Sequence, residues 1–167
     1  YVSPDGSLGI AWSSGVCALT PMEAQMYPDI LAHRENCVCH DMKSIMHRLD
    51  EMGLSFGSFS FDTALAAYDL NPSQSDYPVS KLATNFLATT VDDEDAQACA
   101  EAIWHLKDAL RRELEKQGMQ TLYDEIELPL CATLYRMEKA GVAIDRDRLV
   151  QFGEMLSQRI TDCETLI

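Results

Sequence analysis

The stretch CVCHDMKSIMHRLDEMGLSFGSFSFDTALAAYDLNP, residues 37–72, decides the fold. It opens on a short apolar strand, which we predict over residues 36–39. A helix is then predicted from Asp41 to Met52, because apolar side chains recur there at helical spacing. Gly53 follows directly and would stop this helix. The apolar stripe consists of Met42, Ile45, Met46, Leu49 and Met52.

The second half of the same stretch repeats the pattern of strand and helix. Phenylalanines at residues 56–61 indicate a strand that is interrupted near Gly57. Asp62 is placed to cap a helix that begins at Thr63, and Asn71-Pro72 would end that helix. Strand, helix, strand and helix in this order favour an α/β layer.

Two further elements precede this stretch. Alternation at residues 8–12, a Ser-Ser-Gly turn and the apolar run at residues 16–19 predict a β-hairpin. Pro21 would open a helix that continues to about Ala32. The apolar side of that helix would carry Met22, Met26, Ile30 and Leu31.

Helices dominate the rest of the chain. A short one is predicted at residues 82–87 and a long one at 96–116. The acidic run at residues 92–95 could suggest a metal cluster. It stands, however, where the long helix begins, and acidic residues at a helix start are what the helix dipole favours. We therefore expect the run to begin the helix.

Two more helical patterns follow Gly118. The first covers residues 119–137, where Pro129 should kink or divide it and Gly141 lies past its end. Residues 142–144 are expected to be extended. Asp145 then caps a last amphipathic helix. Its single apolar stripe consists of Leu149, Phe152, Leu156, Ile160, Cys163 and Ile167.

The composition is typical of a packed globular protein with an acidic surface. Of the 167 residues, 47% are hydrophobic and 24% are charged, and the formal net charge is −14. A surface that followed phosphates as a whole would carry the opposite sign. No apolar run approaches the roughly 18 residues of a membrane span. The chain opens on Tyr1 rather than on methionine, so we expect it to be a piece of a longer polypeptide.

Six cysteines are spread along the chain. Each lies in an apolar pattern, and the chain is neither short nor secretory, so free thiols in the cytoplasm are expected rather than disulfides. The run Cys37-Val38-Cys39-His40 resembles half of a zinc site. The sequence has no second Cys/His pair at a suitable spacing, which favours a buried strand with both thiols on one face.

Three segments, in the same order, resemble the bacterial DNA polymerase I family, the family A DNA polymerases. HDMKSIMHRL (40–49) is similar to the second exonuclease segment of that family, and FDTALAAYDLNP (61–72) to the run that follows. EIELPL (125–130) with MEKAGVAID (137–145) resembles the join between the exonuclease and polymerase domains.

The resemblance implies a fold and a division into domains. The expected fold is an α/β, ribonuclease-H-like mixed sheet with flanking helices, followed by an α-helical extension. Residues 1–117 would form a 3′–5′ exonuclease-like domain. Residues 118–167 would begin the thumb of the polymerase domain, whose catalytic aspartates are expected beyond Ile167.

The resemblance also implies where the chemistry of a proofreading exonuclease would lie. Such enzymes hold two divalent metal ions with carboxylates. The family's aspartate in the second segment falls on Ile45, and the aspartate of a later Tyr-x-x-x-Asp falls on Cys99. A one-turn slip in the second alignment would bring Asp95 or Glu101 near the site. We expect no catalytic residue, no metal ligand and no cofactor-binding residue in this chain, because one carboxylate cannot hold two metal ions.

Three functions remain open at this point. The leading hypothesis is an inactive structural module of a DNA-directed DNA polymerase in replication and repair. Mg²⁺ is expected for the parent polymerase, DNA and the remainder of the polymerase domain are the expected partners, and no membrane is. The alternatives are a working 3′–5′ exonuclease and a module that binds single-stranded DNA or a protein. Trp12 and Trp104 are expected to be core aromatics rather than stacking platforms for bases.

Overall fold

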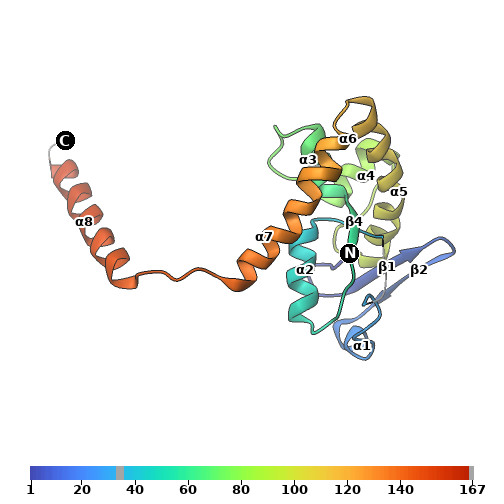
Figure 1. Cartoon of the computed structure of the whole chain (residues 1–167), viewed down its shortest axis with the longest axis horizontal. Helices are drawn as coiled ribbons and strands as arrows, with labels where there is room; N and C mark the ends of the chain where they lie inside the picture. Colours follow the sequence, from blue (N-terminus) through green and yellow to red (C-terminus); the bar gives the residue numbers. More distant parts are fainter. Residues whose placement is uncertain (33–35, 166–167) are drawn as a thin grey trace. The chain divides into compact units, whose positions relative to one another are not determined.

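The computed structural model describes residues 1–32 and 36–165, which form two compact units (Figure 1). The first unit is Tyr1–Arg136 and the second is Met137–Ile167. The first unit is mixed α/β, with two small sheets and many helices. The predicted domain boundary at residues 117/118 stays a prediction, because a compact unit and a family domain need not end at the same residue.

The first sheet is the predicted hairpin. β1 (Leu8–Trp12) pairs antiparallel with β2 (Gly15–Leu19), with Leu8 opposite Leu19 and Trp12 opposite Gly15. The Trp12 indole N–H donates to the hydroxyl of Ser14 in the turn, at 3.0 Å. The hairpin prediction is confirmed.

The helix predicted from Pro21 to Ala32 was wrong in its length. α1 covers only Pro21–Gln25, although Thr20 and Glu23 form a full capping box at its start. Pro28 disfavours helical dihedrals in the residue before it and has no N–H to donate, so the helix cannot continue through it. Met22 and Met26, which the prediction put on a buried face, are 78% and 70% exposed.

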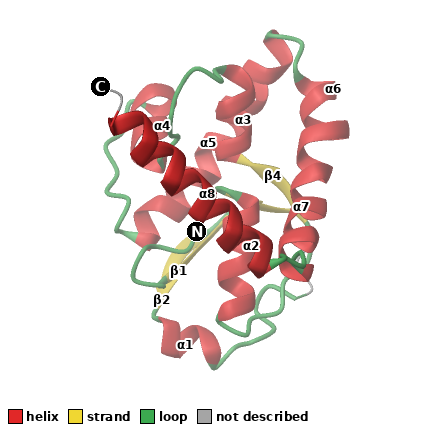
Figure 2. Ribbon diagram, turned by 90° about the vertical axis from the view of Figure 1, so that its left-hand side faces the viewer, coloured by secondary structure: helices red, strands yellow, loops and turns green. Residues whose placement is uncertain are grey.

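The second sheet follows from the central stretch. β3 (Cys37–Cys39) and β4 (Phe59–Asp62) pair in parallel, with an irregularity after Cys37. α2 (Met42–Glu51) connects them and buries four residues of its predicted stripe, whereas the fifth, Met52, is the half-buried C-cap. Phe56 lies outside β4, in an isolated parallel bridge with Leu31. Figure 2 shows the β1–β2 hairpin and β4 as separate yellow strands, in agreement with two sheets of two strands each.

Three helices build the larger core cluster together with Phe61 of β4. They are α3 (Thr63–Leu70), α4 (Val79–Leu87) and α5 (Ala96–Lys116). α5 also packs against β1. α4 begins three residues earlier than predicted, whereas α3 and α5 match their predicted ranges. The stripe of α5 is fully buried, and it meets Phe61 and Tyr123 in this cluster.

The divided helix after Gly118 takes an unusual form. α6 (Gln120–Leu122) runs into a π-helical turn, η1 (Tyr123–Glu127), before α7 (Leu128–Ala140). Pro129 lacks an N–H, and in an α-helix its ring would clash with the carbonyl four residues earlier. The wider π turn directly before the proline provides a local way around this clash.

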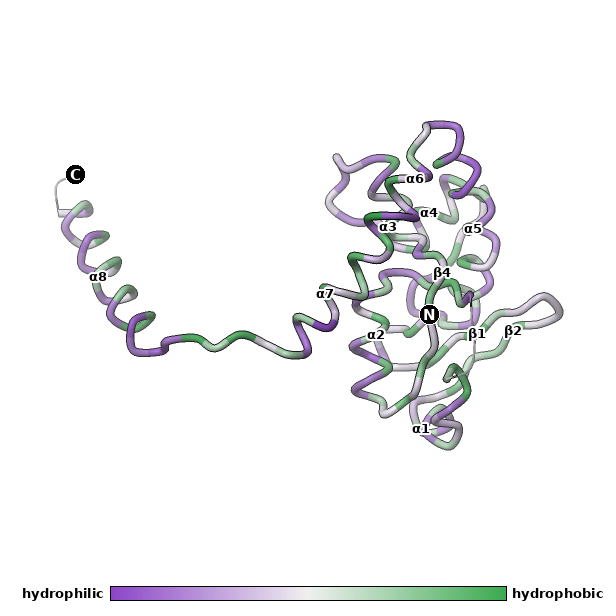
Figure 3. Tube along the Cα trace, viewed as in Figure 1, coloured by the Kyte–Doolittle hydropathy of each residue, from purple (hydrophilic) through white to green (hydrophobic). Residues whose placement is uncertain are grey.

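The second unit contains the end of α7, an irregular segment and α8 (Arg146–Thr165). Asp145 caps α8 as predicted, with Arg148 donating its N–H to the Asp145 carboxylate at 3.1 Å. The apolar stripe of α8 is exposed; Leu149 and Ile160, for example, are 55% and 58% accessible. Green and purple alternate along this helix in Figure 3. Among the described residues, no helix has the length and apolar character of a membrane span.

Candidate functional site

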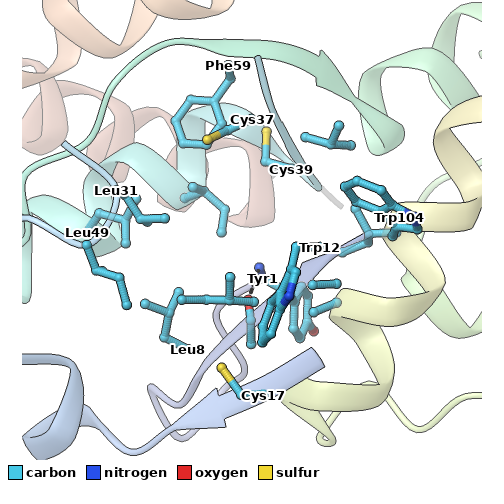
Figure 4. A pocket seen from close by; sticks show the side chains of 18 of the residues that line it. Tyr1, Leu8, Trp12, Cys17, Leu31, Cys37, Cys39, Leu49, Phe59 and Trp104 are labelled. Carbon is cyan, nitrogen blue, oxygen red and sulfur yellow. Dashed lines mark hydrogen bonds between the residues drawn. The ribbon is translucent and has the colours of Figure 1, made fainter. Parts of the chain in front are cut away.

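The first unit contains an apolar cavity of about 730 Å³, which we call the slot. β1 lines it on one side and β3 on another. α2 contributes Ile45 and Leu49, and α5 contributes Ala100, Ile103 and Trp104. In Figure 4 the side chains of Leu49 and Trp104 lie at opposite ends of the view, with Tyr1 between them. The lining is almost entirely hydrocarbon, aromatic ring and thiol.

The expectation that Trp12 and Trp104 are core aromatics was wrong. They are 46% and 42% exposed, and both line the slot. Trp12 is the last residue of β1, beside a two-residue turn that offers little cover. Trp104 lies on α5 between the buried Ile103 and the exposed His105, at the border of the buried stripe. Their rings therefore border the slot and remain open to solvent.

Ile45, which the sequence prediction assigned to the second-segment aspartate, is a buried apolar residue. It is 5% exposed and packs in the smaller core cluster, with Met42 and Leu49 from the same helix. It also lies on the wall of the slot. A hydrocarbon side chain has no lone pair for a hard cation such as magnesium, which takes oxygen ligands.

Cys99, which the sequence prediction assigned to the later aspartate, is fully buried in the larger core cluster. Its thiol donates to the backbone carbonyl of Asp92, at 3.3 Å. Burial, with a smaller contribution from the charge of Asp93, raises the pKa of the Cys99 thiol to about 12. A thiol with this pKa stays protonated at neutral pH, and a protonated thiol is neither a nucleophile nor a good metal ligand.

The acidic run at residues 92–95 lies at the start of α5, as predicted, and two of its carboxylates cap helices. Asp95 accepts the N–H groups of Gln97 and Ala98, both at 3.0 Å, and so caps α5. Asp93 accepts the N–H of Ser80, at 2.9 Å, and so caps α4 from a distance in the sequence. Within residues 1–32 and 36–165, no group of three or more His, Cys, Asp or Glu side chains is arranged to hold a metal ion.

The carboxylate of Asp62 has a larger role than the sequence indicated. One of its oxygens accepts the N–H groups of Ala64 and Leu65, which caps α3 as predicted. The same carboxylate also accepts the N–H groups of Asp41, at 2.9 Å, and Met42, at 2.6 Å, at the start of α2. One buried carboxylate therefore caps two helices, and no spacing in the sequence announces the second cap.

Tyr123 ties the π-helical turn to the same point. It is fully buried, and its hydroxyl donates to the backbone carbonyl of Asp62 at 3.0 Å and accepts the Asp62 N–H at 2.6 Å. The Tyr123 ring lies 5.1 Å from that of Phe61. Sequence reasoning placed Tyr123 only on an apolar helix face and missed this contact.

The run Cys37-Val38-Cys39-His40 forms the predicted strand and a turn. The Cys39 thiol is buried and donates to the backbone carbonyl of Phe61, at 3.6 Å. His40 Nδ1 lies 2.9 Å from the hydroxyl of Thr63. Burial lowers the pKa of His40 to about 4, so its imidazole is neutral at pH 7. These contacts account for both side chains without a metal ion.

Comparison with known proteins gives a consistent answer. No family model matches the chain. DNA polymerase I of Caldicellulosiruptor bescii is 31% identical, over 78% of this chain and 16% of that protein. DNA polymerase I of Bacillus subtilis is 31% identical over 76% of this chain and 17% of that protein. For Geobacillus stearothermophilus DNA polymerase I the identity is 29%, over 99% of this chain and 22% of that protein.

A solved structure agrees with these relatives. The POL domain of Pol1 from M. smegmatis, in complex with DNA primer-template and dNTP, superimposes with a TM-score of 0.74 at 26% identity. The match covers 92% of this chain and 28% of that one. This chain thus spans less than a quarter of the curated relatives named above. On these similarities in sequence and fold, it belongs to the bacterial DNA polymerase I family, the family A DNA polymerases.

Proposed function

We propose that residues 1–117 are a ribonuclease-H-like, 3′–5′ exonuclease-like domain that has lost its metal-binding carboxylates and acts as a structural module of a DNA polymerase. The observation that carries this proposal is the burial of Ile45 and Cys99, two side chains without carboxylates, at the positions where the family resemblance calls for aspartates. Both are packed in the core, which is the role of a structural residue.

The parent protein, on this proposal, is a DNA-directed DNA polymerase, a nucleotidyltransferase that acts in replication and repair. Residues 118–167 would begin its polymerase domain with the first helices of the thumb. The support is that the relatives are DNA polymerases and that a structural neighbour is a polymerase domain with bound DNA and dNTP. DNA and Mg²⁺ would then be bound by the parent polymerase, in the cytoplasm, and the rest of the polymerase domain would be the partner of this chain.

A metal titration tests the inactive module. Two-metal nucleases need several carboxylates that converge on the ions. Isothermal titration calorimetry with Mn²⁺ should therefore detect no stoichiometric site in this chain. The double variant Ile45→Asp, Cys99→Asp is the matched control, because it puts the two carboxylates back at their family positions. A stoichiometric Mn²⁺ site in the unmodified chain, lost on substitution of Asp95 or Glu101, would overturn the proposal.

A single-stranded DNA-binding module is the second candidate, and the exposed rings of Trp12 and Trp104 favour it. Aromatic side chains that are open to solvent can stack on bases. The net charge of −14 opposes binding, since phosphate contacts need lysine and arginine. A titration with oligo(dT), followed by tryptophan fluorescence at low salt, separates the two. Saturable quenching that Trp12→Ala or Trp104→Ala removes would favour the binding module.

A further inference from the structure

The π-helical turn η1 is bound to α3 through its first residue. Tyr123 is fully buried, and its hydroxyl exchanges hydrogen bonds with the backbone N–H and C=O of Asp62, the N-cap of α3. The turn closes where the Leu128 N–H donates to the Tyr123 carbonyl, five residues earlier. Pro129 follows and has no N–H. The Leu128 N–H is therefore the last backbone donor that holds the turn before the proline.

The last residue of the same turn, Glu127, acts on α3 in the opposite sense. Asp69, in the last turn of α3, is only 8% exposed. One of its carboxylate oxygens is buried and has no hydrogen-bond partner within the described residues. α3 packs against η1, and the charge of Glu127 disfavours a second negative charge on Asp69. The two carboxylates therefore repel each other when both are charged.

No cation within the described ranges lowers the pKa of Asp69. α3 packs against β4, η1 and α5. The Arg111 guanidinium of α5 is paired with Asp124 of η1, at 3.2 Å. The buried thiol of Cys99 and the buried hydroxyl of Tyr123 stay protonated, because burial raises the pKa of both. The buried or half-buried charged side chains on these three elements are Asp62, Lys107, Arg111, Glu113, Asp124 and Glu127.

We propose that Asp69 and Glu127 form a proton-dependent switch on the π-helical turn. A proton from water binds the Asp69 carboxylate and removes one of the two negative charges, so that the Glu127 end of η1 packs on α3. When Asp69 returns this proton to water, the two carboxylates repel each other. The hydrogen bond from Leu128 to Tyr123 then opens more often, while the Tyr123 hydroxyl stays bound to Asp62.

The burial of Asp69 sets the direction of the switch. Burial, with a smaller effect from Glu127, raises the Asp69 pKa from 3.8 to about 6. A group with a raised pKa stabilises the state that holds its proton, fully below the lower value and no longer above the higher one. The closed turn is therefore favoured below about pH 4 and loses this support as the pH rises towards 6.

Hydrogen exchange at the Leu128 amide measures the opening of the turn. The observed rate is divided into the intrinsic rate at each pH, which gives a protection factor. This factor should fall by roughly five- to tenfold between about pH 5 and pH 7. Low concentrations of urea should leave it unchanged, because urea promotes global unfolding and has little effect on a local opening that exposes little surface.

Three variants show whether the two carboxylates cause the effect. Asp69→Asn keeps the shape of the protonated acid and should give the same Leu128 protection at both pH values. Glu127→Gln removes the repelling charge, so the fall in protection should move to lower pH. Glu125→Gln is the matched control, because Glu125 is an exposed carboxylate on the same turn, and it should leave the transition where it is.

Any of three results would overturn the proposal. One is a Leu128 protection factor that is equal at the two pH values, or that still falls in Asp69→Asn. Another is the same transition in Glu127→Gln and Glu125→Gln. The third is a loss of protection at the Asn71 N–H, which ends α3, with none at Leu128. That result would show that the end of α3 opens and the π-helical turn does not.

Discussion

At the scale of single residues, Asp62 joins three segments of the chain by hydrogen bonds. Its carboxylate accepts N–H groups from the starts of α2 and α3, and its own backbone bonds to the Tyr123 hydroxyl. The sequence predicted the cap on α3 because an aspartate before a helical run is a common N-cap. It could not predict the cap on α2, since that contact depends on how β3 and β4 align.

Asp62→Ala should therefore destabilise the protein far more than the loss of a single cap. It leaves N–H groups at the starts of two helices without an acceptor, in a buried setting. We expect the free energy of unfolding to fall by about 3 kcal/mol or more. Asp95→Ala is the control, since Asp95 caps α5 alone at an exposed position, and it should cost about 1 kcal/mol. Urea unfolding of both variants measures the difference; equal losses would contradict the double cap.

Asp69 makes the stability depend on pH. One of its carboxylate oxygens is buried without a hydrogen-bond partner, and burial, with a smaller effect from Glu127, raises the Asp69 pKa to about 6. The folded state thus holds this proton more tightly than the unfolded state, where the pKa is 3.8. Stability from this group is present below about pH 4 and is lost as the pH rises towards 6.

Asp69→Asn should remove that loss. The variant should be more stable than the parent chain at pH 7 by about 1 kcal/mol. This figure includes a reduction for solvent screening of the Asp69 carboxyl. The gain should shrink towards pH 4. Thermal unfolding at a series of pH values from 4 to 7 measures it, and a gain that is the same at every pH would show that Asp69 does not titrate in this range.

At the scale of elements, periodicity and caps predicted most helices and strands, and the exceptions have physical causes. The hairpin, α2, α3, α5 and α8 follow from apolar spacing and capping residues. α1 is short because Pro28 overrides the apolar pattern of the preceding residues. Trp12 and Trp104 are exposed because an aromatic side chain at a strand end or beside a helix stripe is buried only if another element covers it. For the candidate site, the replacement of carboxylates at Ile45 and Cys99 stays a prediction from the sequence. The slot arises from strand pairing and could not be predicted.

The π-helical turn should be held by the Tyr123 hydroxyl. Tyr123→Phe leaves the N–H and C=O of Asp62 without the hydroxyl as a partner, and both residues are buried. The free energy of unfolding should fall by about 1–3 kcal/mol. Tyr27→Phe is the control, because Tyr27 is 56% exposed, and its cost should lie near zero. Chemical unfolding measures both; a cost near zero for Tyr123→Phe would mean that the turn does not depend on this contact.

α8 should be the least protected helix of the chain. Its apolar stripe is exposed, and an isolated helix of 20 residues is marginal in water. Amides at residues 150–165 should exchange rapidly at low protein concentration, while those at the centre of α5 should exchange orders of magnitude more slowly. Protection of α8 equal to that of α5, and independent of concentration, would contradict this expectation.

At the scale of the whole molecule, the proposed role rests on what the packed core excludes. Ile45 and Cys99 are buried side chains without carboxylates, and the proposal assigns them to the positions at which a proofreading site needs carboxylates. The net charge of −14 disfavours phosphate binding by the surface as a whole. Stability without chemistry is the property expected of a structural module.

The most direct test of that central claim is a proofreading assay on the DNA polymerase that carries this sequence. A primer-template with a mismatched, labelled 3′ nucleotide is incubated with Mg²⁺ or Mn²⁺ in the absence of dNTPs. The account predicts that the mismatched nucleotide stays in place, although the same preparation extends a matched primer when dNTPs are added. Removal of the mismatched nucleotide that a chelator stops, and that persists through repeated purification, would contradict the account.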